Sequence, residues 1–201
     1  MAVELGLRER KKLQTRQQIF EAARKLFAER GFDSVTVADI ARAADVSEVT
    51  VFNYFPTKED LFYGGMQFFE EQLIQAVRDR ARSETPLKAL RRTLIDSADS
   101  LASRERIDAI IRATTAVNGS PSLAAREREI VERYTRRLAG LLAGDPEDVQ
   151  ALATASALMG AHRAVVDHTR KLVLNGVRGR ALVAQTRAAI RRAYGPLEKG
   201  L

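Results

Sequence analysis

The run from Thr36 to Leu61, TVADIARAADVSEVTVFNYFPTKEDL, constrains the fold more than any other part of the chain. Ile40 and Ala44 recur at helical spacing, and small residues at such positions let a second helix cross closely. Asp45 interrupts the pattern and tolerates the left-handed backbone of a tight turn. Ser47 suits a helix N-cap, because its hydroxyl accepts from free backbone N–H groups. The run therefore predicts two short helices joined by a tight turn, with a third helix beginning near its end.

The second of these helices is expected to have one apolar and one polar face. Val51 and Phe55 lie on the side that the core would bury. The other side presents four polar side chains, those of Glu48, Thr50, Asn53 and Tyr54. A short helix with a polar outer face, held against another helix by a tight turn, is the layout of a helix-turn-helix that reads DNA. We predict this motif over about residues 36–55.

The same stretch closely resembles the end of the DNA-binding region in TetR-family transcriptional regulators. The family pattern runs Val-Ser, two variable residues, Thr, an aliphatic and an aromatic residue, any residue, His or Tyr, Phe, two more residues, then Lys-Glu-x-Leu. The chain matches it with Val46, Ser47, Thr50, Val51, Phe52, Tyr54, Phe55, Lys58, Glu59 and Leu61. It departs at Asp45, where Gly is usual, and at Val49, where a small residue or Pro is frequent. Val49 is expected to alter what the recognition helix touches.

Composition and topology agree with an all-α protein. Ala and Leu are plentiful, aromatic residues make up only 6% of the chain, and Val and Ile do not form alternating runs. The resemblance, specific in sequence to about residue 62, implies nine helices in two domains. Residues 1–56 would hold a three-helix DNA-binding unit, and residues 57–201 would bind a ligand and form the dimer.

Turn and cap residues set the expected helix limits. Gly31 and Asn175–Gly176 act as stops, while Pro86, Ser120–Pro121 and Asp145–Pro146 act as starts, with Ser120 and Asp145 as caps. Thr36 with Asp39, and Thr57 with Asp60, resemble capping boxes. The first helix would begin near Arg8 or Thr15 and end at Arg30. The later helices would span residues 58–83, 86–103, 105–117, 121–143, 146–175 and 179–194.

The formal net charge of +7 is consistent with nucleic-acid binding, but it does not lie in the helix-turn-helix. Residues 1–60 carry ten basic and ten acidic side chains, so the excess comes from the remainder. The early cluster of Arg8, Arg10, Lys11, Lys12 and Arg16 is the better indication, because it can reach phosphate or the minor groove.

Nine residues are expected at the DNA: Arg16, Thr36, Ser47, Glu48, Val49, Thr50, Asn53, Tyr54 and Lys58. Thr36, Ser47, Thr50 and Lys58 would contact phosphates; for Thr36 the resemblance implies this role, which is compatible with capping. Glu48, Asn53 and Tyr54 would face base edges, with Asn53 on adenine, Glu48 on cytosine and Val49 on a thymine methyl. Lys58 opposes the dipole of its own helix, so it is read either as a phosphate ligand or as a solvated side chain.

The two helices near the C-terminus carry many small residues. On residues 146–175 these are Ala151, Ala153, Ala155, Ala157, Gly160, Ala161 and Ala164, and on 179–194 they are Ala181, Ala184, Ala188, Ala189 and Ala193. Such faces serve either intrachain packing alone or a homodimer that pairs these helices as a four-helix bundle. The resemblance favours the dimer, which would present two recognition helices to a double-stranded operator.

The candidate ligand pocket consists of Phe62, Met66, Phe69, Thr114, Asn118, Met159, His162 and Arg163, although each taken singly suits the core. Arg163 is also placed to pair with Asp167. These side chains would suit a small, mainly apolar effector with one or two polar handles.

Several function classes are disfavoured. The chain has no Cys, and its two His residues, His162 and His168, lie on different helix faces, so no metal and no cofactor is expected. The sequence contains no nucleophile–base pair and no phosphate-binding loop, so an enzyme is not expected. It also contains no apolar run of about 20 residues that could span a membrane, and its N-terminus lacks the apolar core of a signal peptide, so a cytoplasmic protein is expected. We expect a dimeric repressor released from a pseudo-palindromic operator by a small molecule; the alternative is a ligand-independent regulator or activator.

Overall fold

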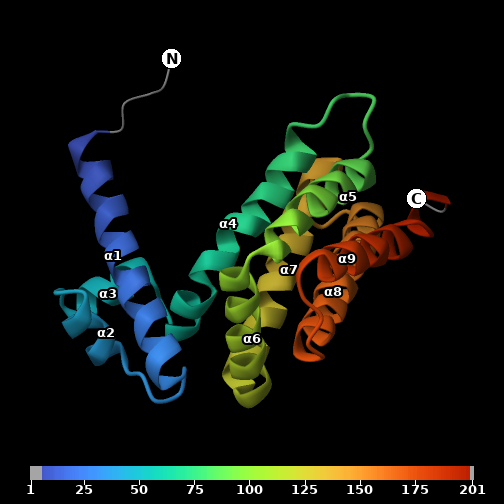
Figure 1. The fold of residues 1–201 in the computed structure, drawn as a ribbon. Helices are drawn as coiled ribbons and strands as arrows, with labels where there is room; N and C mark the ends of the chain where they lie inside the picture. Colours follow the sequence, from blue (N-terminus) through green and yellow to red (C-terminus); the bar gives the residue numbers. More distant parts are fainter. Residues whose placement is uncertain (1–5, 200–201) are drawn as a thin grey trace. The chain divides into compact units, whose positions relative to one another are not determined.

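The chain folds as an all-helical protein (Figure 1). The computed structural model describes residues 6–199, except for the side chains of residues 66–69 and 199. Within the described residues there are α-helices and two short 3-10 helices but no β-strand, which confirms the predicted all-α class. The 3-10 helices η1 (Ala98–Ala102) and η2 (Leu197–Lys199) were not expected, so the helix total exceeds nine.

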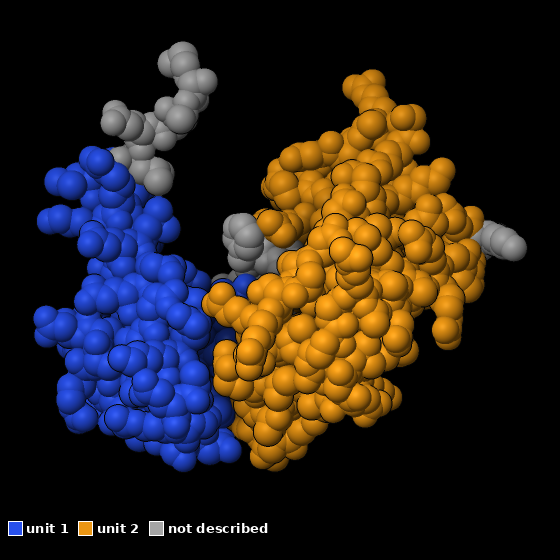
Figure 2. All heavy atoms as spheres, in the orientation of Figure 1, with its two compact units in different colours: residues 1–67 blue, residues 68–201 orange. Residues whose placement is uncertain are grey.

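The α-helices keep the expected order along the chain. They are α1 (Leu7–Arg30), α2 (Val37–Ala43), α3 (Glu48–Tyr54), α4 (Lys58–Arg78), α5 (Pro86–Ser97), α6 (Arg104–Gly119), α7 (Pro121–Ala143), α8 (Val149–Leu174) and α9 (Gly179–Tyr194). The helices form two compact units, residues 1–67 and residues 68–201 (Figure 2). The division falls inside α4, later than the functional boundary expected after residue 56, because the first turns of α4 pack with unit 1.

Unit 1 has a small core made by α1, α2, α3 and the start of α4. Ile19 of α1, Ile40 of α2 and Val51 of α3 are fully buried in it. Its remaining buried members are Ala23, Leu26, Val35, Ala41, Ala44, Phe55 and Leu61. The face of α1 that carries Ile19, Ala23 and Leu26 therefore packs against the helix-turn-helix.

A close helix approach in unit 1 explains a glycine in the middle of α4. A Cβ added to Gly64 would lie 2.9 Å from Cδ2 of the Phe20 ring on α1. Only glycine lets that ring approach the helix so closely, although glycine in a helix interior costs about 1 kcal/mol relative to alanine. Gly64 thus fixes the distance between α1 and α4.

Unit 2 contains the end of α4 and all later helices. Within it α7 packs on α8, and α8 packs on α9. A buried cluster joins η1 and the start of α6 to the end of α8 and the start of α9. Its members include Leu101, Ile107, Val173 and Leu182. The hydroxyl of Tyr194, fully buried on α9, donates to the Leu158 carbonyl of α8 at 3.2 Å.

Three helix limits differ from the expectation. α4 ends at Arg78 rather than near residue 83, and α5 ends at Ser97, where η1 continues the chain. α8 begins at Val149 rather than Pro146, because Asp148 is its cap and accepts from the Ala151 N–H at 2.8 Å. The Asp145 carboxylate instead accepts from the Glu147 N–H at 2.9 Å within the preceding turn.

The described residues contain neither a membrane-spanning helix nor a cluster of metal-binding side chains. None of their helices combines the length and hydropathy that crossing a membrane requires. Nor do three or more His, Asp or Glu side chains among them gather as a metal site would need.

Candidate nucleic-acid interface

The start of α2 is held by a complete capping box. The Thr36 hydroxyl accepts from the Asp39 N–H at 3.1 Å, and the Asp39 carboxylate accepts from the Thr36 N–H at 3.1 Å and from its hydroxyl at 2.7 Å. These bonds to Thr36 hold the pKa of Asp39 below its usual value, since they stabilise the carboxylate. The predicted cap is confirmed, and Thr36 is exposed beside it.

The turn between α2 and α3 depends on one strained residue. Asp45 has a φ of 51°, and no other non-glycine residue in the described part of the chain has a positive φ. The next residue returns to the helix, because the Val46 N–H donates to the Ala41 carbonyl at 3.0 Å. The left-handed turn expected at Asp45 is confirmed.

Ser47 caps α3 as expected. Its hydroxyl accepts from the Thr50 N–H at 3.1 Å and lies 2.8 Å from the Thr50 hydroxyl. The two hydroxyls therefore form one polar pair at the first turn of the helix. Such a pair, with the free N–H groups of a helix start, suits contact with a phosphate.

The exposed face of α3 is more apolar than the sequence indicated. Glu48 and Asn53 are exposed as predicted, but Val49 and Phe52 are also 68% and 48% exposed. Tyr54, expected at the base edges, is half-buried against the core of unit 1. Phe52 was not among the residues predicted to contact DNA, although it occupies the aromatic position of the family pattern. The face thus combines two polar groups with two apolar groups that suit thymine methyls.

Side chains of α1 fix the position of the helix-turn-helix. The Arg16 guanidinium donates to the Tyr54 carbonyl at the end of α3, at 3.0 Å, and lies 4.3 Å from the centre of the Phe55 ring. The Gln18 amide donates to the Ala44 carbonyl at the end of α2, at 2.8 Å. Arg16, predicted at the DNA, therefore holds the recognition helix against α1.

Lys58, also predicted at a phosphate, has acceptors within unit 1. Its ammonium donates to the carbonyls of Phe32 and Val35, at 3.0 and 3.1 Å, and lies 4.2 Å from the centre of the Phe32 ring. These carbonyls offset the unfavourable position of a cation at a helix start. The geometry thus accounts for Lys58 without a phosphate, and its contact with DNA remains a prediction.

The basic cluster ahead of the core belongs to a helix. Arg8, Arg10, Lys11 and Lys12 are exposed on the first turns of α1, before its first buried residue, Ile19. A helical segment of this charge can lie along a phosphate backbone, and its contribution to affinity would fall with salt.

The predicted pocket residues with described side chains have different surroundings. Phe62 belongs to an aromatic cluster in unit 1, 5.5 Å from the Phe32 ring. Asn118 and Arg163 are exposed, with Arg163 4.0 Å from the Asp167 carboxylate, as the alternative reading had it. The buried Thr114 hydroxyl donates to the Ile110 carbonyl of its own helix.

Four predicted pocket residues remain, two of which have described side chains. The side chains of Met66 and Phe69 lie outside the described residues. Met159 is buried and lines a small cavity. Burial lowers the pKa of His162 to about 4, with a further contribution from Arg170, so its imidazole is neutral at pH 7.

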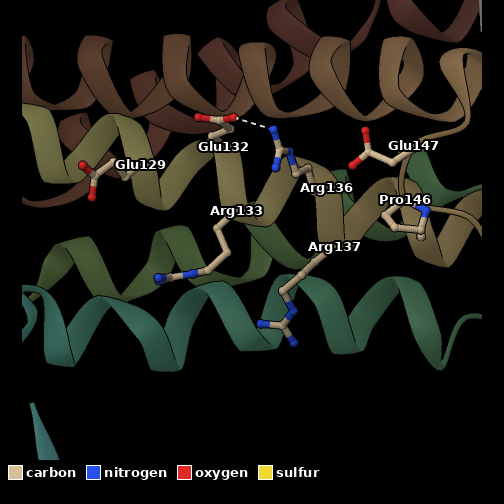
Figure 3. Close-up of a pocket in the computed structure, with 8 residues that line it drawn as sticks. Glu129, Glu132, Arg133, Arg136, Arg137, Pro146 and Glu147 are labelled. Carbon is tan, nitrogen blue, oxygen red and sulfur yellow. Dashed lines mark hydrogen bonds and ion pairs between the residues drawn. The ribbon is translucent and has the colours of Figure 1, made fainter. Parts of the chain in front are cut away.

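Unit 2 contains a small cavity and an open groove among its described residues. The cavity beside Met159 has a volume of about 10 Å³ and is lined by Glu70, Leu73, Ile74, Leu90, Tyr134, Leu138 and Met159. The other is an open groove of about 530 Å³ along α7 and the turn before α8 (Figure 3). Much of the charge along this groove is paired: Arg136 bonds Glu132 at 2.9 Å, and Arg137 bonds Glu71 of α4 at 2.8 and 3.0 Å. The groove is therefore a charge-balanced surface, whereas the cavity is walled mostly by apolar side chains with Glu70 and Tyr134 as its polar members.

The small residues of α8 and α9 divide between two roles. Ala151 and Ala155 of α8 are buried within the chain. Others remain exposed: Ala153, Gly160 and Ala164 on α8, and Ala181, Ala184 and Ala188 on α9. Intrachain packing thus accounts for only part of the small-residue pattern.

Comparisons with known proteins agree with this geometry. Residues 19–63 match the family model "Bacterial regulatory proteins, tetR family". The transcriptional regulator MftR of Mycobacterium tuberculosis is 28% identical over 165 residues, which cover 79% of this chain and 81% of that protein.

Two solved structures share the fold over most of their length. A TetR-family regulator from Streptomyces coelicolor has a TM-score of 0.58 and 20% identity, covering 98% of this chain and 99% of that one. The TetR-family repressor FadR of Thermus thermophilus, solved with lauroyl-CoA, has a TM-score of 0.56 and 24% identity, covering 89% and 92%. The family model and the capped helix-turn-helix identify residues 19–63 as the DNA-binding region of a TetR-family bacterial transcriptional regulator, and the shared fold extends over most of the chain.

Proposed function

We propose that the chain is a homodimeric repressor that occupies a pseudo-palindromic operator in double-stranded DNA and is released by a small-molecule effector. It would act in the bacterial cytoplasm. Residues 1–56 would supply the DNA contacts, and residues 57–201 the dimer and the effector site. The observation that carries the proposal is the exposed face of α3, held in place by Ser47, Arg16 and Gln18.

The proposed reading of DNA divides between positioning and sequence. Thr36, Ser47, Thr50 and the basic start of α1 would contact phosphates, which set the register on the duplex. Glu48 and Asn53 would pair with cytosine and adenine, while Val49 and Phe52 would pack on thymine methyls. One short recognition helix gives weak discrimination, so a second copy is needed for a specific operator.

The exposed small residues of α8 and α9 support a dimer through these helices. Small side chains allow helices to approach closely, as pairing of Ala153, Gly160 and Ala164 with a second copy would require. A two-fold axis between the copies would place two recognition helices at half-sites about 34–36 Å apart.

The proposed effector response depends on α4, since this helix begins at the helix-turn-helix and ends among the helices of unit 2. A ligand would release DNA only if it favours one arrangement of α4 over another. A ligand-independent regulator of the same fold is the second candidate, and the small volume of the cavity beside Met159 favours it.

A footprint on the DNA flanking the chain's own gene, repeated with cell extract, tests the whole proposal. We expect a protected site with two-fold symmetry that disappears when extract containing the effector is added. A symmetric footprint that no extract or metabolite fraction alters would support the ligand-independent alternative. Absence of any protected site, with protein that is folded and dimeric in solution, would refute operator binding at this locus.

A further inference from the structure

Unit 2 buries a carboxyl group that is only partly satisfied by hydrogen bonds. Glu70 of α4 is 8% exposed, and its Oε2 atom has no hydrogen-bond partner among the described residues. Its cavity is otherwise walled by hydrocarbon from Leu73 and Ile74 of α4, Leu90 of α5, Leu138 of α7 and Met159 of α8. A buried polar atom without a partner is costly, so its presence in a core requires an explanation.

Neighbouring charges do not neutralise this carboxyl. The Tyr134 hydroxyl of α7 is its hydrogen-bonding neighbour, while Arg133, Arg137 and Glu127 act on it only through longer-range fields. The Arg137 guanidinium is already held in two hydrogen bonds by Glu71. Burial therefore dominates and raises the pKa of Glu70 to about 7.

The chemistry of the cavity selects the missing partner. In the ionised form of Glu70 the carboxylate can only accept, so a partner of ionised Oε2 must be a donor, and a cationic donor forms the strongest such bond. The volume of about 10 Å³ is close to that of one water-sized sphere. A primary ammonium group has that size, whereas a trimethylammonium group does not.

We propose that Glu70 and Tyr134 bind the ammonium end of an apolar primary amine, with Glu70 Oε2 accepting from the ammonium and the hydrocarbon walls covering the adjoining carbon atoms. The inference rests on the proposed effector response and names its ligand class. The hydrocarbon tail needs more room than the cavity has, so binding must part the helices that enclose it. Glu70 lies 12 residues after the first residue of α4, a rise of about 18 Å along the helix, so parting at this point displaces the segment that continues into unit 1.

Matched probes separate this ligand class from others. The full-length protein is titrated with octylamine, octan-1-ol, octanoate and octyltrimethylammonium, followed by thermal unfolding and calorimetry. Octylamine is expected to raise the Tm and to bind at least about tenfold more tightly than the other three. Equal or tighter binding of octanoate or octyltrimethylammonium would overturn the proposal, and so would absence of octylamine binding, which is the result expected if a single water fills the cavity.

Two neighbouring carboxyls provide the variant and its control. Glu70→Gln keeps the shape of the side chain and removes its charge, so octylamine affinity should fall at least about tenfold. Glu71→Gln removes the adjacent exposed carboxyl that pairs with Arg137 and should leave the affinity unchanged. A loss in Glu71→Gln equal to that in Glu70→Gln would show that general surface charge binds the amine.

The pH dependence supplies a further readout. Because the ammonium favours ionised Glu70, a proton leaves the carboxyl on binding, and octylamine affinity should rise by about tenfold from pH 6 to pH 8. Glu70→Gln should lose this dependence. An affinity independent of pH in the unmodified protein would contradict a bond to Glu70.

An operator-release assay distinguishes this inference from the proposed function. If octylamine binds through Glu70 but leaves DNA binding intact, the amine site is supported and the proposal that its ligand releases the operator is refuted. If a metabolite fraction releases the operator but no amine binds, the response stands and the amine site is refuted.

Discussion

Replacing Lys58 by methionine tests whether this residue stabilises unit 1 or neutralises a phosphate. The substitution keeps most of the hydrocarbon stem and removes the ammonium. Removing the ammonium eliminates its two hydrogen bonds to the Phe32 and Val35 carbonyls, at 3.0 and 3.1 Å, and its contact with the Phe32 ring. All three lie within unit 1, so a change in stability is the direct consequence.

The magnitude follows from these contacts. Each hydrogen bond from a charged donor contributes about 1.5 kcal/mol, and a partly exposed cation–π contact about 0.5 kcal/mol. Ordering the long side chain and hydration of the freed carbonyls offset part of this sum. We expect Lys58→Met to lower the free energy of unfolding by about 2 kcal/mol and the Tm by about 4–8 °C.

The salt dependence of DNA binding gives the discriminating assay. Fluorescence anisotropy with an operator fragment at several salt concentrations yields the slope of log affinity against log salt. If the ammonium serves only the fold, the slope should be unchanged, whereas loss of a phosphate contact would reduce it by about 0.9 for each subunit bound. Lys25→Met, at an exposed lysine of α1, is the control and should alter neither Tm nor slope. An unchanged Tm with a reduced slope for Lys58→Met would refute the reasoning.

Three further substitutions test the recognition unit and the buried carboxyl. Asp45→Gly should raise the free energy of unfolding by about 0.5–1 kcal/mol in a urea titration, because the φ of 51° is strained for Asp; a loss of stability would contradict this. Phe52→Ala should weaken operator binding by about 1–2 kcal/mol without lowering the Tm, since the side chain is 48% exposed; unchanged anisotropy titrations would remove Phe52 from the interface. Glu70→Gln should stabilise the ligand-free protein by about 2 kcal/mol at pH 8 and by much less near pH 4. The folded-state pKa of Glu70, about 7, lies above the ordinary 4.5, so the folded state holds the extra proton and stability falls as the pH rises between these values; equal gains at both pH values would contradict the burial argument.

The features predicted correctly are those that short stretches of backbone determine. Thr36 with Asp39, and Thr57 with Asp60, form caps as expected, since each pair is three residues apart. Asp45 adopts the left-handed turn for the same local reason. The start of α8 was misjudged because two Asp residues compete there, and Asp148 rather than Asp145 points at the free N–H groups.

The partners of long side chains could not be predicted in this way. Arg16 and Lys58 were placed at the DNA from charge and family pattern, yet each has carbonyl acceptors that are 38 and 23–26 residues away in the chain. Phe52 resembles a core residue in sequence and is exposed in the fold. The sequence did not indicate the burial of Glu70, because a Glu in a helix ordinarily faces water.

The sequence by itself determined the helical class, the caps and turn of the helix-turn-helix, and the motif that indicates a DNA-binding regulator. These depend on hydrogen bonds and periodicities within a few residues, where the order of side chains is sufficient information. Only the tertiary structure decided the exposure of Phe52, the acceptors of Lys58 and the burial of Glu70. Burial depends on how helices distant in the chain rotate and pack against one another, because the cost of leaving a polar atom unpaired is set by its neighbours in space.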